Sequence, residues 1–160
     1  MRILIVSDTH GQNRNLEKAI ERVGAIDMLV HLGDLEGLEG YISELVDCPV
    51  HMVAGNNDFF SDLNREEEFE IGAYHTFITH GHCYYVSMNT ERIKQEGMER
   101  NADIVMFGHT HKPLIDRGNG ITLINPGSLS YPRQEGRKGS FILMEIDDKG
   151  EAHYTLNYVE

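Results

Sequence analysis

Short apolar runs alternate with segments of helical periodicity along the chain, and this alternation is typical of an α/β domain. The runs are rich in isoleucine, valine and leucine, as the buried strands of a sheet usually are. At the end of the chain, Tyr154, Leu156 and Tyr158 alternate with polar residues and predict a half-exposed strand. The apolar runs predict strands at Ile3–Val6, Met28–Val30, Val50–Val53, Thr76–Thr79, Ile104–Phe107, Ile121–Ile124 and Phe141–Ile146.

Three of the segments between these runs have helical periodicity. In the first two, apolar residues recur at a spacing of three and four, and each stripe is expected to face the core. The third has a weaker apolar pattern that Gly97 interrupts. The segments predict helices over Leu16–Val23, over Leu38–Leu45 and from near Thr90 to Arg100.

The later half of the chain favours sheet over helical crossovers. Glycine-containing turns at 118–120 and 147–150 predict two hairpins. The acidic run Glu66–Glu68 is expected to be a solvated surface without a special role. The mixture predicts two packed sheets flanked by helices, and the length of 160 residues suits a single domain over residues 1–160.

The chain is acidic, with a formal net charge of -12 at pH 7. This charge argues against bulk binding to nucleic acid or to an anionic membrane, because such binding depends on lysine and arginine neutralising phosphates. Bound divalent ions would reverse the sign locally, so a small anionic substrate stays compatible with the composition. No apolar stretch approaches the length of a membrane span, and no signal peptide is expected, so we expect a cytoplasmic protein.

Polar clusters follow most of the apolar runs directly, where a strand end can point side chains into a shared crevice. Aspartate, asparagine and histidine together supply the oxygen and nitrogen donors that suit manganese, iron, zinc or nickel. No competing Ser-His-Asp arrangement accompanies them. The clusters are Asp8-Thr9-His10, Gly33-Asp34, Gly55-Asn56, His80-Gly81-His82 and Gly108-His109-Thr110-His111.

The spacing within the clusters favours a metal site with two cations. Asp8 and His10 are two residues apart, so on an extended segment both side chains point the same way, and His109 and His111 repeat this spacing. The carboxylate of Asp34 can bridge two cations with its two oxygens, which neither an imidazole nor an amide can do. Each cluster alone would be an ordinary turn, but five together are difficult to obtain by chance.

The clusters, in this order and spacing, resemble the calcineurin-like metallophosphoesterase superfamily over nearly the whole chain. The opening ILIVSDTHG, the GHTH cluster and the later Asn125-Pro126-Gly127-Ser128 are similar to the small bacterial and archaeal phosphodiesterases of the YfcE and MJ0936 type, which are related to the eukaryotic retromer subunit Vps29. The resemblance implies an α/β fold, a four-layer α-β-β-α sandwich of two mixed sheets flanked by helices, with the metals above the strand ends.

The resemblance also implies a ligand set for two divalent ions. Manganese is expected first, with nickel, iron and zinc as alternatives. In the family, a hydroxide that bridges the metals attacks phosphorus, and bound cations lower the pKa of such a water. Carried over to this chain, one ion would be held by Asp8, His10, Asp34 and His111, and the second by Asp34, Asn56, His80 and His109.

One cluster departs from the superfamily pattern. Many members have a histidine after the asparagine of this cluster, where it contacts phosphate and assists the leaving group, but this chain has Asn57. An amide can donate a hydrogen bond to a phosphoryl oxygen but cannot deliver a proton as a general acid. His82 is the candidate replacement acid. Asp58 is expected to orient a metal-ligating histidine.

Other polar side chains are candidates for lesser roles. Four of them could reach a substrate anion: Asn13, Arg14, Arg133 and Arg137. We nevertheless expect each arginine to be exposed to solvent. The remaining histidines are expected to be structural or exposed; they are His31, His51, His75 and His153.

The sequence leaves two function classes. The first is a divalent-metal-dependent phosphohydrolase acting on a small phosphoester, most simply a phosphodiester. The alternative is a non-catalytic, Vps29-like protein-binding scaffold, which would be free to lose a metal-ligating residue, whereas this chain has kept all seven. The physiological substrate and the oligomeric state stay open, and a homodimer is compatible with the sequence.

Overall fold

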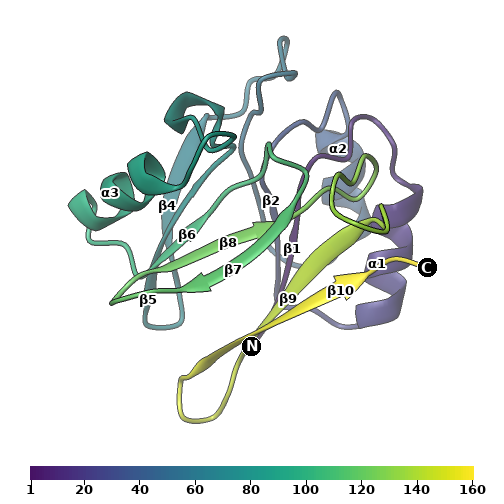
Figure 1. The fold of residues 1–160 in the computed structure, drawn as a ribbon. Helices are drawn as coiled ribbons and strands as arrows, with labels where there is room; N and C mark the ends of the chain where they lie inside the picture. The colour runs from purple at the N-terminus through teal and green to yellow at the C-terminus, as the bar shows by residue number, and fades with distance from the viewer.

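The computed structural model describes all 160 residues, and its strands form two five-stranded mixed sheets (Figure 1). In the first sheet, β1, β2 and β3 are parallel, and β9 and β10 extend the sheet antiparallel to β1. Its order is β10-β9-β1-β2-β3, with β1 Arg2–Val6, β2 Met28–His31, β3 Val50–Met52, β9 Ser140–Ile146 and β10 Ala152–Tyr158.

The second sheet has a parallel centre and two antiparallel edges. Strands β5, β6 and β8 run parallel, while β4 and β7 pair antiparallel with β5 and β8. Its order is β4-β5-β6-β8-β7, with β4 Glu66–Ile71, β5 Tyr74–Thr79, β6 Ile104–Met106, β7 Pro113–Arg117 and β8 Thr122–Pro126.

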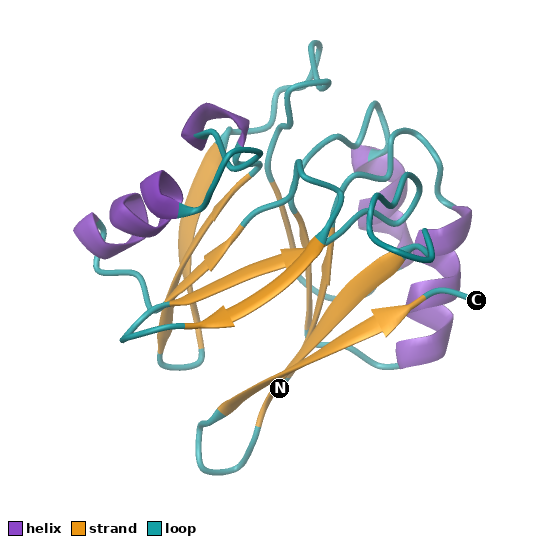
Figure 2. Ribbon diagram, viewed as in Figure 1, coloured by secondary structure: helices purple, strands orange, loops and turns teal.

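The helices lie on the outer faces of the two sheets (Figure 2). Helices α1, Arg14–Val23, and α2, Glu39–Leu45, cover the first sheet, and α3, Glu91–Glu99, covers the second. A short 3-10 helix, η1, His82–Tyr84, follows β5. The arrangement confirms the expected four layers, and none of the helices has the length and hydropathy that crossing a membrane requires.

Three apolar clusters fill the three interfaces between these layers. The largest lies between the sheets and joins residues such as Ile5 and Val30 to Ile78 and Met106. The second packs α1 and α2 on the first sheet, and the third packs α3 on the second sheet. Alternate residues of β1 therefore face opposite clusters, since Ile3 and Ile5 lie in the first and Leu4 and Val6 in the second.

The predicted strands, helices and hairpins are all present, but two edge strands were absent from the prediction. One of them, β4, contains the acidic run, so the expectation of a solvated surface without a role was wrong. Glu66 and Glu68 accept hydrogen bonds from Arg100 at 2.7 and 3.1 Å. The guanidinium of Arg100 lies 4.1 Å above the ring of Phe77. The acidic run therefore ties edge strand β4 to the end of α3.

Candidate metal centre

The loops that follow β1, β2, β3, β5 and β6 carry the predicted metal-binding residues to one end of the sandwich, the upper end in Figure 1. Strands β1, β2, β5 and β6 end in buried residues and β3 is half-buried, and together they fix the start of each loop. Within each sheet, neighbouring loops are joined because the backbone N–H of Gly108 donates to the carbonyl oxygen of His80 and that of Asp8 donates to Gly33. The two sheets are joined by the backbone N–H of His109, which donates to the carboxylate of Asp8 at 3.1 Å. All seven residues named from the sequence meet at this end.

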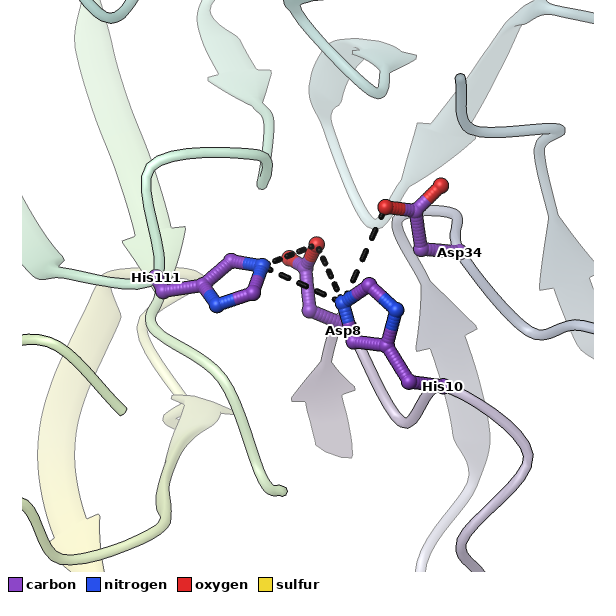
Figure 3. A group of neighbouring side chains, drawn as sticks. All are labelled: Asp8, His10, Asp34 and His111. Atoms are coloured by element: carbon purple, nitrogen blue, oxygen red, sulfur yellow. Dashed lines mark hydrogen bonds and ion pairs between the residues drawn. The ribbon is translucent and has the colours of Figure 1, made fainter. Parts of the chain in front are cut away.

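Asp8, His10, Asp34 and His111 form a first group of donor atoms, which all lie within 4.8 Å of one another (Figure 3). Nε2 of His10 lies 3.7 Å from a carboxylate oxygen of Asp8 and 3.7 Å from one of Asp34. Nε2 of His111 lies 3.1 Å from Oδ1 of Asp8 and 3.2 Å from Nε2 of His10. Two carboxylates and two imidazoles thus point at one small volume.

Asn56, His80 and His109 form a second group on the other side of Asp34. Oδ1 of Asn56 lies 2.9 Å from Nε2 of His80 and 3.1 Å from Nδ1 of His109. Nε2 of His80 lies 3.5 Å from Oδ2 of Asp34, the same oxygen that faces His10 in the first group. Asp34 is therefore the carboxylate that both groups share.

The buried carboxylate of Asp8 shows that this donor set fits a cation. Its Oδ1 is buried and accepts no hydrogen bond, although it points into the first group. Burial alone would raise the pKa of Asp8, but the nearby imidazoles of His111 and His80 hold it below its usual range. A charged oxygen without a donor is costly in a protein interior, and a bound divalent ion would supply the missing partner.

The histidines are oriented by hydrogen bonds from their other ring nitrogens. Nδ1 of His80 donates to the carbonyl oxygen of Leu32 at 2.6 Å, and Nδ1 of His111 donates to that of Tyr131 at 2.7 Å. A proton on Nδ1 leaves the lone pair of Nε2 directed into the site, which is the arrangement that metal-ligating histidines use. The chain thus fixes both the ring positions and the tautomer.

The backbone at these residues is unusual. Nine non-glycine residues of the chain have positive φ, and five of them are candidate ligands: Asp8, His10, Asp34, His109 and His111. Few L-residues adopt this left-handed region, although aspartate and histidine tolerate it better than most, and such residues concentrate at functional sites. The left-handed turns aim these side chains back across the strand ends.

Asp58 does not orient a histidine, so the expectation from the sequence was wrong. Its carboxylate accepts backbone N–H groups of Asp34, Gly55 and Glu36 at 2.8, 2.7 and 2.7 Å, and a longer bond from Leu35. These bonds hold the loop after β2 against the loop after β3. Gly55 is needed there because a side chain at this position would overlap the backbone and carboxylate of Asp34. Asp58 therefore positions the shared carboxylate through the backbone.

The two candidate catalytic residues occupy different places around the centre. Asn57 donates to both carboxylate oxygens of Asp34, from its backbone N–H at 2.9 Å and its side-chain amide at 2.8 Å. The ring of His82 lies 5.4 Å from that of His80 and 6.0 Å from that of His109. Nδ1 of His82 is buried without a partner, and burial together with His80 and His109 lowers its pKa. His82 borders the second donor group and forms no part of either.

Several residues that support the site were not identified as site residues from the sequence. Ser7 donates to Asp8 at 2.6 Å, and Glu36 binds Nδ1 of His10 at 3.0 Å. Ser128 donates to the backbone oxygen of Asp8 at 2.8 Å. The opening ILIVSDTHG contains Ser7 and the NPGS segment contains Ser128, but both segments were quoted as signs of a family and not of these contacts. Loop geometry, which no local pattern encodes, brings them to the site.

The other candidates named from the sequence lie around the centre or away from it. Asn13 precedes α1, but its side chain makes no capping hydrogen bond. His31 is fully buried between Thr9 and Gly33, and burial lowers its pKa to about 4, so it is a neutral structural residue. Arg133 and Arg137 are exposed residues that line a cavity beside His10 and His111.

Comparisons with known proteins agree with this geometry. Residues 1–149 match the family described as the calcineurin-like phosphoesterase superfamily domain. The chain is 32% identical over 149 residues to the probable metallophosphoesterase YsnB of Bacillus subtilis, covering 92% of this chain and 86% of that protein. It is 33% identical over 145 residues to phosphodiesterase MJ0936 of Methanocaldococcus jannaschii, covering 79% and 83%.

A solved structure has the same fold. The crystal structure of Vps29 from Entamoeba histolytica, complexed with Zn²⁺, matches with a TM-score of 0.79. The two sequences are 26% identical, and the match covers 99% of both chains. The similar proteins thus include both proteins named as phosphoesterases and a protein named Vps29.

Proposed function

The chain belongs to the calcineurin-like phosphoesterase superfamily and is a metal-dependent phosphoesterase, and we propose that it is a phosphodiesterase with two divalent cations at its centre. The observation that carries the proposal is the place of Asp34. Its Oδ2 lies 3.7 Å from Nε2 of His10 in one donor group and 3.5 Å from Nε2 of His80 in the other. A shared carboxylate between two complete donor groups supports two ions better than one.

Some residues of the site would bind the two cations, and others would orient these ligands. Asp8, His10 and His111 would hold the first cation with Asp34, and Asn56, His80 and His109 the second. When bound, divalent cations supply an activated water and neutralise phosphoryl oxygens. Leu32 and Tyr131 keep the imidazoles oriented through their carbonyl oxygens, and Asp58 keeps the loop of Asp34 in place.

Two observations support a diester substrate with a good leaving group. The relative from Methanocaldococcus jannaschii is named a phosphodiesterase. The position where an acid could protonate the leaving group holds Asn57, whose amide is engaged with Asp34. An absent general acid costs about 10²–10⁴ in rate when the leaving group is poor, and much less when it is good.

We expect metal-free protein to be inactive and to regain phosphodiesterase activity with two equivalents of manganese. The test loads the protein in turn with manganese, nickel, iron and zinc, and assays phosphomonoesters, phosphodiesters and cyclic nucleotides. Metal content is measured for each preparation. Binding of a single ion by a fully active enzyme would overturn the two-cation centre. Inactivity with every metal would instead favour the protein-binding scaffold.

We further expect His82→Ala to separate substrates by their leaving groups. If the His82 imidazole protonates the leaving oxygen, its loss should lower kcat on alkyl diesters by about 10²-fold, and on p-nitrophenyl diesters by less than about threefold. His153→Ala is the matched control, because His153 lies on the exposed β9–β10 hairpin. An equal loss on both substrates, with the metal content unchanged, would remove His82 from this role.

A further inference from the structure

We infer that Arg133 and Arg137 form a second anion-binding subsite beside the metal centre, for a substrate that carries another phosphate group near the scissile phosphoester. The inference rests on the proposed function for the position of the scissile group. It extends that function by naming the class of substrate, an ester with two phosphates.

The cavity opens directly from the metal centre. It has a volume of about 630 Å³ and is lined by His10, His111, Tyr131, Pro132, Arg133 and Arg137. This volume falls within the range of typical small-molecule sites and exceeds what one phosphate needs. Two candidate ligands of the first cation and two arginines therefore line the same open cavity.

The loop that carries Arg133 is tied to the metal-binding residues. The backbone N–H of Arg133 donates to the carbonyl oxygen of His111 at 3.0 Å. In return, Nδ1 of His111 donates to the carbonyl oxygen of Tyr131 at 2.7 Å. Ser128 accepts the backbone N–H of Tyr131 at 2.8 Å and donates to Asp8. The position of Arg133 relative to His111 is therefore set by backbone contacts.

Arg137 lies on a turn of the same loop. Its φ is 43°, and its backbone N–H donates to Gln134 at 3.1 Å. The side chain of Gln134 donates to the carbonyl oxygen of Lys138 at 2.6 Å and closes the turn. A left-handed residue other than glycine or asparagine is uncommon in a turn. The turn brings the second guanidinium to the same cavity as the first.

Neither guanidinium has a partner of opposite charge. The chain carries 26 acidic and 14 basic residues, yet no carboxylate lies within ion-pair distance of Arg133 or Arg137. Glu135 lies between them in the sequence but does not line the cavity. Two free guanidinium groups in an acidic protein favour an anion, and their planar forks match the oxygens of a phosphate.

The first test measures binding without catalysis. Protein loaded with manganese is titrated by calorimetry with methylphosphonate and with methylenediphosphonate, which has one more phosphonate group and no ester to hydrolyse. We expect the wild type to bind the diphosphonate at least about tenfold more tightly, and the double variant Arg133→Gln/Arg137→Gln to lose most of this preference. Arg92→Gln is the matched control, since Arg92 lies on α3 beside Tyr85.

The second test compares two chromogenic diesters that differ by one phosphate. These are thymidine 5'-(p-nitrophenyl phosphate) and the same compound with a 3'-phosphate. We expect the double variant to lower kcat/KM for the 3'-phosphorylated compound about tenfold more than for the other. An equal effect on both substrates, or a diphosphonate preference that survives in the double variant, would overturn the subsite. If the wild type hydrolyses neither compound, the proposed function fails, and the calorimetry still decides the subsite.

Discussion

Replacing Asp34 with asparagine should abolish phosphodiester hydrolysis while leaving the fold intact. Asparagine loses the negative charge and replaces one carboxylate oxygen with an amide NH₂, which cannot bind a cation. The loss should be about 10³-fold or more in kcat, the order seen when one electrostatic partner of a transition state is removed. The measurement is kcat on an activated diester, together with the metal content of the purified variant. The bound metal should fall below two ions per chain.

The control for this variant is Asp47→Asn, which makes the same change of charge at an exposed residue after α2. It should keep full activity and full metal content. A circular dichroism spectrum and an unfolding curve of Asp34→Asn show whether the fold persists. Full activity in Asp34→Asn would contradict the assignment of this residue as the shared ligand.

Asp58→Ala should strongly destabilise the loops around the site. The variant leaves the backbone N–H groups of Asp34, Gly55 and Glu36 without their acceptor. Two of these charged hydrogen bonds are partly buried and the third is exposed, and their combined loss should lower the free energy of unfolding by about 3–5 kcal/mol. Urea unfolding of the metal-free protein measures this directly.

Asp58→Asn separates the hydrogen bonds from the charge. An asparagine whose oxygen takes the place of Oδ2 would still accept the bonds from Asp34, Leu35 and Gly55. It should therefore cost only about 1–2 kcal/mol. Asp62→Ala, an exposed residue on the same loop, should cost less than about 0.5 kcal/mol. If Asp58→Ala were as stable as Asp62→Ala, the loop would not depend on this carboxylate.

The buried centre of each sheet could be predicted from the sequence because burial on both faces demands uninterrupted apolar residues. Two of the four edge strands, β4 and β7, could not be predicted. Strand β4 has the sequence EEEFEI and exposes charged residues, and β7, PLIDR, begins with proline and ends in charge. Charged residues and proline at an edge strand protect a sheet from pairing with other chains. The same residues interrupt the apolar pattern by which a strand is predicted from sequence.

The seven candidate ligands could be predicted because each follows a strand, so the fold itself gathers them. The hydrogen-bond partners of these ligands lie on loops that are distant in the sequence. No short sequence pattern predicts the path of such a loop. Asp58 illustrates the difference. We expected its carboxylate to orient a metal-ligating histidine, but it accepts a hydrogen bond from the backbone N–H of Asp34. Arg133 was likewise named from the sequence, but only the loop from Ser128 shows that it faces the cavity with His111.

The left-handed backbone of the five ligand residues has a consequence for protein engineering. Each such residue lowers the free energy of unfolding of the metal-free protein by on the order of 1 kcal/mol relative to an unstrained backbone. The orientation of these side chains therefore reduces the stability of the protein. Glycine at any of these positions would relieve the backbone strain but would remove a donor atom from the centre; the positions are Asp8, His10, Asp34, His109 and His111. An engineering effort to stabilise this protein should therefore leave these turns alone and seek its gains on the distant hairpin and the outer helices.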